Sequence, residues 1–225
     1  MFKILSNAQK GFTLIEMMVS TAVAAIGMAG AISIFATTVQ YNTTSMQQIR
    51  LDQELRAIMN VMSQDIRRAG YWADANGVDD NPFANNANLM TWSAAESCFW
   101  YIYDADNSGD VNAGDQQGVR LIGSAVNIVG SAVGCGDTDS ADDWSQISDS
   151  RSINITALNF AIADDACINA TTDQRTCNTA IATDVLRTMK VVTITLTGEL
   201  VSEPGVSDTL TETVTVRNTV QTVQS

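Results

Sequence analysis

The chain has 225 residues, 45% of them hydrophobic, and a formal net charge of −13 at pH 7. An acidic surface repels nucleic acid, whose binding depends on phosphate neutralisation by Lys and Arg, so we expect no nucleic-acid partner. The chain contains no histidine, which excludes histidine-based acid–base catalysis, Ser-His triads and His-ligated zinc.

Residues 1–39 combine a short basic leader with a long apolar stretch. Residues 1–11 carry Lys3 and Lys10 and no acid, and residues 12–39 carry one charge, that of Glu16. The apolar stretch would form a helix about 42 Å long, and roughly 20 residues already span a bilayer. The lysines favour a cytoplasmic leader and a head on the other side of the membrane. Hydropathy alone also fits a plain signal anchor, but a carboxylate inside a membrane is costly and is usually retained for a function.

Residues 40–69 are predicted to continue as an amphipathic helix. Apolar side chains recur at steps of three and four, on one helix face: Leu51, Leu55, Ile58, Met62, Ile66 and Ala69. A helix that is continuous from residue 12 to residue 68 would be about 85 Å long, and only part of it would fit in a membrane. Gly70 is expected to end it.

The rest of the chain, residues 70–225, is predicted to be a β-rich head. Strand patterns occur at residues 98–103, 119–122, 153–162, 192–196 and 214–216. A change of parity near Ala157 indicates a bulge, and residues 198–208, which contain Glu203-Pro204-Gly205, should connect a hairpin. The expected fold is α+β, with an antiparallel sheet packed on the amphipathic half of the helix.

Four cysteines follow the apolar stretch: Cys98, Cys135, Cys167 and Cys177. An even number in an exported domain indicates two disulfides, with three connectivities formally open. We favour the sequential pairing, Cys98 with Cys135 and Cys167 with Cys177, for which loop-closure entropy would contribute roughly 4 and 3 kcal/mol. The spacing lacks a CxxC pair, so a cysteine metal site is the weaker interpretation.

Residues 104–115 fit the spacing of a twelve-residue calcium loop. Oxygen-bearing side chains stand at positions 1, 3, 5, 9 and 12, which are Asp104, Asp106, Ser108, Asn112 and Asp115. Gly109 stands at position 6, where a sharp turn is needed, and Asp110 at position 7 would contribute its backbone carbonyl. Carboxylates this close repel one another unless a cation neutralises them, and hard oxygen ligands favour Ca²⁺ over Zn²⁺.

The 104–115 loop departs from the EF-hand pattern in two respects. Position 12 is Asp115 rather than the longer Glu, and strands rather than helices are predicted on both sides. The alternative is an ordinary solvated loop rich in Asp, Asn and Gly. The sequence therefore gives Ca²⁺ as the candidate cofactor and leaves the solvated loop open.

The leader and anchor resemble those of type IV prepilins, on the motif Lys10-Gly-Phe-Thr-Leu-Ile-Glu16. The resemblance implies that prepilin peptidase cuts between Gly11 and Phe12 on the cytoplasmic side and methylates the amino group of Phe12. It also implies that Glu16 attracts the amino terminus of a neighbouring subunit during assembly. Many pilins have a helix-breaking proline in this segment, whereas this chain has only Pro82 and Pro204.

Two further segments are similar to PilW-type minor pilins. They are Met62-Ser-Gln-Asp-Ile-Arg-Arg-Ala-Gly-Tyr-Trp72 at the predicted helix end and the strand over residues 211–218. The resemblance implies a structural subunit, not an enzyme, that takes part in type IV pilus assembly by priming it or in a tip complex. Its partners would be other minor pilins, the major pilin, a pilus tip protein and the inner membrane, and its final place would be the cell surface. A J-type minor pseudopilin of type II secretion and a pilin-displayed adhesin are the alternatives.

Overall fold

The computed structural model describes residues 11–74, 81–85, 89–130, 135, 144–178, 180–218 and 220–223. The chain divides into two units, Met1–Met46 and Gln47–Ser225. Residues 1–10, which make up most of the expected leader, lie outside the described residues.

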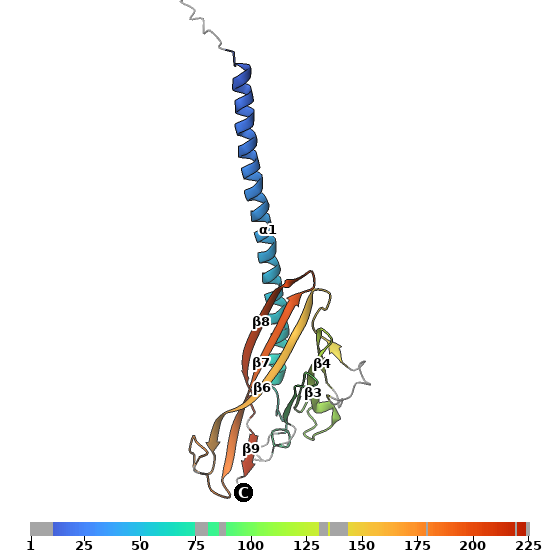
Figure 1. Ribbon diagram of the computed structural model, residues 1–225. Helices are drawn as coiled ribbons and strands as arrows, with labels where there is room; N and C mark the ends of the chain where they lie inside the picture. Colours follow the sequence, from blue (N-terminus) through green and yellow to red (C-terminus); the bar gives the residue numbers. More distant parts are fainter. Residues whose placement is uncertain are drawn as a thin grey trace, which may run out of the picture. The chain divides into compact units, whose positions relative to one another are not determined.

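One helix, α1 (Leu14–Ile66), runs from the first unit into the second (Figure 1). Its 53 residues confirm the predicted continuous helix to within two residues at each end. α1 ends at Ile66, four residues before the predicted stop, and the turns that follow it reach Gly70, whose φ of 73° is in the left-handed region that favours glycine. The Gly70 backbone N–H then donates to the carbonyl of Ile102, 2.8 Å away, and so joins the helix end to the second strand of the head.

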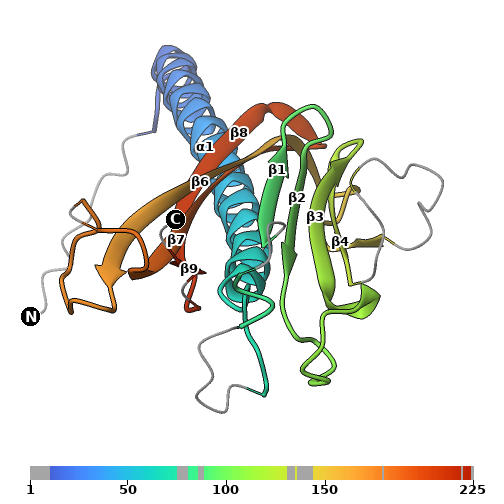
Figure 2. The same cartoon turned by 90° about the horizontal axis from the view of Figure 1, so that it is seen from below.

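The second unit contains two antiparallel sheets, where the sequence had suggested one. The first has the order β1-β2-β3-β4-β5, and the second has the order β6-β7-β8 with β9 also paired to β7 (Figures 1 and 2). The strands are β1 (Met90–Ser93), β2 (Cys98–Ile102), β3 (Gln116–Ile122), β4 (Ala125–Val129), β5 (Ser145–Gln146), β6 (Ile153–Asn169), β7 (Val185–Leu200), β8 (Glu203–Thr215) and β9 (Val220–Val223).

Both sheets share one hydrophobic core with the C-terminal part of α1. The six stripe residues predicted from their spacing are all buried, and burying a large apolar side chain contributes about 1.5–3 kcal/mol. α1 and β7 approach each other closely at Gly198, where a Cβ would lie 2.9 Å from the Leu55 Cδ2 atom. Glycine at this position therefore lets α1 pack tightly on the second sheet.

The second sheet confirms the predicted bulge and the predicted hairpin, and it refines the position of the hairpin turn. β6 has a register shift between Ile155 and Ala157, the bulge expected from the parity change. β7 and β8 pair as a hairpin, but the turn is at residues 201–202 and Glu203 already belongs to β8. The register shifts again next to this turn, between Glu199 and Leu200. A bulge accommodates Pro204, which has no backbone N–H to donate.

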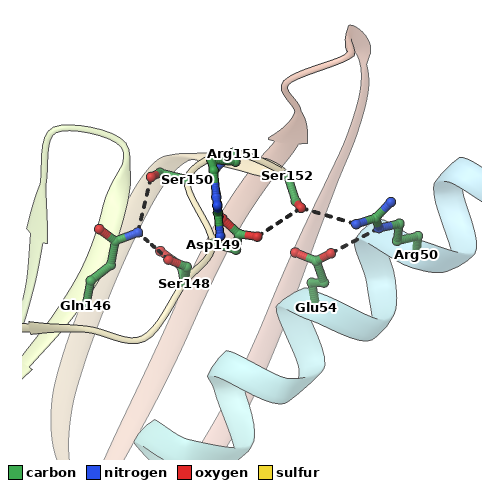
Figure 3. A network of polar contacts seen from close by, with 8 residues as sticks. All are labelled: Arg50, Glu54, Gln146, Ser148, Asp149, Ser150, Arg151 and Ser152. Carbon is green, nitrogen blue, oxygen red and sulfur yellow. Dashed lines mark hydrogen bonds and ion pairs between the residues drawn. The ribbon is translucent and has the colours of Figure 1, made fainter.

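A network of polar contacts holds the β5–β6 connection against α1 (Figure 3). Arg50 of α1 lies 3.2 Å from Glu54 and donates to the Ser152 hydroxyl at 3.2 Å, and that hydroxyl donates to Asp149 at 3.3 Å. Hydrogen bonds from the Arg151 backbone and side chain lower the pKa of Asp149. Exposed ion pairs of this kind add little to stability, so we assign the network a role in positioning the β5–β6 connection on α1.

Candidate functional site

The apolar side chains of residues 12–39 are not covered by any other part of the described structure. In residues 12–39 the large apolar side chains are between 47% (Val39) and 79% (Leu14) exposed. Among the described residues, α1 is the one helix that is long and apolar enough to cross a membrane. Such a surface needs lipid or other apolar helices around it.

Glu16 has a local role that the sequence interpretation missed. The Thr13 hydroxyl accepts from the Glu16 backbone N–H at 3.3 Å, and the Glu16 carboxylate accepts from the Thr13 backbone N–H at 3.5 Å. This reciprocal pair is a capping box, which satisfies two of the free N–H groups at a helix start. The spacing Thr-x-x-Glu was the signal in the sequence that could have predicted it.

The two segments that resemble minor pilins lie against each other, although almost 150 residues separate them. The Arg217 backbone N–H donates to the Arg67 carbonyl at 3.4 Å, and the Asn218 side chain donates to the Ala69 carbonyl at 3.0 Å. Together they line a groove of about 530 Å³ that contains Arg67, Arg68 and Arg217. The C-terminal segment thus binds carbonyl groups of the turn that follows α1, those of Arg67 and Ala69.

A carboxylate and two tyrosines connect the end of α1 to the first sheet. Asp65 accepts hydrogen bonds from the hydroxyls of Tyr101 and Tyr103, the latter at 3.2 Å. Arg68 lies 3.6 Å from Asp65, and its guanidinium carbon lies 4.2 Å from the centre of the Tyr103 ring. Burial and the nearby Asp65 charge raise the pKa of Tyr101 well above its ordinary value and that of Tyr103 to about 12.

The 104–115 loop joins β2 to β3, so strands flank it as the sequence predicted. The Tyr103 backbone N–H donates to the Asp115 carbonyl at 3.2 Å and closes the loop at its base. Asp104 and Asp115 are buried, with exposed fractions of 1% and 0%, whereas Asp106 is exposed. One carboxylate oxygen from each of these three residues lies within 4.8 Å of the other two.

The remaining expected ligands also converge in the loop. The Asn112 side-chain N–H₂ group donates to the Asp106 carboxylate at 3.0 Å, to the Ser108 hydroxyl at 3.3 Å and to the Asp110 carbonyl at 3.5 Å. Hydrogen bonding by Ser108 and Asn112 lowers the pKa of Asp106, which keeps this carboxylate ionised. Contacts thus connect all six residues that the spacing predicted, three through the carboxylate cluster and three through the Asn112 side chain.

Trp72 and Ala73, in the segment after α1, form hydrogen bonds with the 104–115 loop that the sequence did not predict. The Trp72 indole N–H donates to the Gly109 carbonyl at 3.0 Å, and the Ala73 backbone N–H donates to the Asp104 carboxylate at 3.0 Å. Gly109 has a φ of 81°, which fits the sharp turn expected at this position. The segment after α1 and the 104–115 loop therefore form one hydrogen-bonded substructure.

The four cysteines form two disulfides with the sequential pairing. Cys98 is joined to Cys135 and Cys167 to Cys177, each with Cα atoms 5.8 Å apart. Cys98 begins β2 and is fully buried, so its bridge ties residue 135 to the first sheet. The second bridge joins Cys167 of β6 to Cys177 in the connection between β6 and β7.

Two family models match the sequence. Residues 44–216, about three quarters of the chain, match a family described as prepilin peptidase-dependent protein B, and residues 6–32 match the prokaryotic N-terminal methylation motif. No curated protein and no solved structure matches the chain.

Proposed function

Because this chain belongs to the prepilin peptidase-dependent protein B family and is a type IV minor pilin-like protein, we propose that it is a structural minor subunit that primes type IV pilus assembly or lies in a tip complex. In this proposal prepilin peptidase cuts the chain between Gly11 and Phe12. The subunit then remains anchored in the inner membrane until assembly, with its head in the periplasm. Its partners are other minor pilins, the major pilin and a pilus tip protein.

One observation carries this proposal: an uncovered apolar helix with a single carboxylate near its start. The large side chains of residues 12–39 are exposed, and both a bilayer and the helical core of a filament would bury them. Transfer from one to the other exchanges one apolar surrounding for another, so apolar burial does not oppose the move. Glu16, the charged residue of this segment, is the group that can distinguish the two surroundings, because a buried carboxylate needs a partner and a filament would supply one from a neighbouring subunit.

The partner that we propose for Glu16 is the amino terminus of the neighbouring subunit. Two unit charges 4 Å apart attract by about 4 kcal/mol at an effective dielectric constant of 20. Such an attraction offsets the cost of burying Glu16 and aligns the two helices. The capping box with Thr13 positions the carboxylate at the end of the helix, where an incoming amino group would meet it.

We expect Glu16→Gln to be processed and inserted normally but to be depleted about tenfold or more in filaments. Glutamine keeps the capping box and removes the charge, so it separates the electrostatic role from the local one. The measurement is the amount of subunit in sheared, purified filaments relative to the membrane fraction, by immunoblotting. A tenfold loss corresponds to about 1.4 kcal/mol, less than the attraction that would be lost.

Thr13→Ala is the matched control, since it removes the capping hydroxyl and keeps the charge. It should enter filaments far better than Glu16→Gln. If Glu16→Gln is recovered at wild-type levels while Glu16→Ala and Thr13→Ala are both depleted, Glu16 acts as a helix cap and the proposed charge attraction is refuted.

A further inference from the structure

We propose that the 104–115 loop is a calcium-binding site. The side chains of Asp104, Asp106, Ser108 and Asp115 and the backbone carbonyl of Asp110 would be ligands, with Asn112 binding directly or through a water molecule. This proposal rests on the geometry of the loop and is independent of the assembly function, so each can fail without the other.

An oxygen atom without a partner points to the ligand. The Oδ1 atom of Asp104 is buried and accepts no hydrogen bond, whereas Oδ2 of the same carboxylate accepts from Ala73 and, inside the loop, from Gly109 at 3.2 Å. The carboxylate is therefore fixed toward the loop interior with one oxygen unsatisfied. A buried charged group is normally hydrogen-bonded, paired or bound to a metal, and a cation in the loop would satisfy Oδ1.

The charge of the cluster also favours a cation. Asp104 and Asp115 are both buried and their carboxylates lie close to that of Asp106, yet in the described part of the chain no Lys or Arg forms an ion pair with any of the three. Like charges at this distance repel. Asp115 is stabilised by N–H groups of Ala105 and Asn112, at 2.9 and 2.8 Å, but hydrogen bonds leave the summed negative charge in place.

The oxygen atoms at positions 3, 5 and 7 of the loop all contact the side-chain amide of Asn112. Its N–H₂ group is held by oxygens of Asp106, Ser108 and Asp110, which are positions 3, 5 and 7 of the calcium loop. These oxygens thus already converge on one positively polarised group, as they would on a cation. The Asn112 Oδ1 atom accepts from the Gly114 N–H at 2.8 Å and caps the short helix Ala113–Asp115, which fits a position-9 residue that acts through water.

The number and type of donors select calcium. Three carboxylates, a hydroxyl, a carbonyl and an amide or water give at least six hard oxygen ligands on a turn that can adjust its geometry, and Ca²⁺ accepts six to eight such ligands. Mg²⁺ requires a tighter octahedral shell and loses its water reluctantly. Thiolate and imidazole ligands, which soft metals prefer, do not occur among residues 104–115.

The test is a titration of the full chain in detergent micelles, freed of metal with a chelator, with CaCl₂ by isothermal titration calorimetry. We expect saturable binding of one Ca²⁺, a melting temperature that rises with CaCl₂ and falls with chelator, and at least about tenfold weaker binding of MgCl₂. A wild-type chain with no heat of binding and a melting temperature unaffected by CaCl₂ and chelator overturns the proposal.

The variants compare two carboxylates of the same loop. Asp106→Asn removes an exposed ligand and should weaken Ca²⁺ binding by about tenfold or more, whereas Asp110→Asn removes the same charge from a residue that would bind through its backbone. Asp110→Asn should bind within about threefold of wild type. Equal losses in the two variants would mean that the loop only attracts cations by its general charge, which would overturn the assigned coordination.

Discussion

Chains that carry Gly11→Leu should keep Met1 at their amino terminus and should not mature. In the proposed function prepilin peptidase reads the Gly11–Phe12 junction, and its active site leaves little room for a side chain at Gly11. A Cβ at Gly11 would meet no atom within 4 Å in the described chain, so the substitution does not disturb the protein itself. The measurement is the intact mass of the protein from cells that contain the peptidase.

Gly27→Leu is the matched control for this variant. Gly27 lies in the same apolar helix, and a Cβ there would also meet nothing within 4 Å. Its chain should be cut as the wild type is. A Gly11→Leu chain that starts at Phe12 would contradict the assigned processing site.

Stability should fall steeply above pH 10, because Tyr101 and Tyr103 must stay protonated in the folded head. Their pKa values are raised on folding, that of Tyr103 to about 12, so above pH 10 the folded state holds more protons than the unfolded state. The free energy of unfolding then decreases with pH, at a rate that approaches about 1.4 kcal/mol per pH unit for each tyrosine. Below pH 10 this stabilisation is fully present. Urea unfolding between pH 9 and pH 12, followed by near-ultraviolet circular dichroism, measures the slope.

Two tyrosine variants isolate this effect from other groups that titrate at high pH. Tyr103→Phe should reduce the slope by about the share of one tyrosine. Tyr71→Phe is the matched control, because Tyr71 is 40% exposed and its loss leaves the hydrogen bonds of Tyr101 and Tyr103 to Asp65 in place. A slope that is the same in all three proteins would show that the contacts with Asp65 do not control the alkaline transition.

The helix and strands β2, β3, β6, β7 and β8 could be predicted because their periodicities are local, whereas β1, β4, β5 and β9 were missed. The stripe from Leu51 to Ala69 repeats at helical spacing, and Val192, Ile194 and Leu196 alternate along β7, and all of these are buried. The division into two sheets could not be predicted, because alternation shows which face is buried and not which strand is the neighbour. The extension of β6 beyond Ile162 was missed since a second register shift, between Asp164 and Ala166, interrupts its pattern.

The candidate sites show the same difference between local and distant signals. The 104–115 loop could be proposed as a candidate calcium site because its oxygen-bearing side chains follow one another at fixed intervals in twelve residues. The contacts of Asp65 with Tyr101 and of Trp72 with Gly109 connect residues 36 and 37 positions apart, so no spacing rule predicts them. The capping box of Thr13 and Glu16 did have a local signal, the spacing Thr-x-x-Glu. It was missed because the charge of Glu16 in an apolar segment was interpreted only in terms of the membrane and assembly.

The most direct test of the assembly function is the intact mass of the wild-type chain in sheared, purified filaments. The account predicts a chain of residues 12–225 with one methyl group on the amino terminus of Phe12. It also predicts that this species is missing from cells without prepilin peptidase. A chain that begins at Met1, or one that is confined to the membrane fraction while filaments assemble without it, would contradict the account.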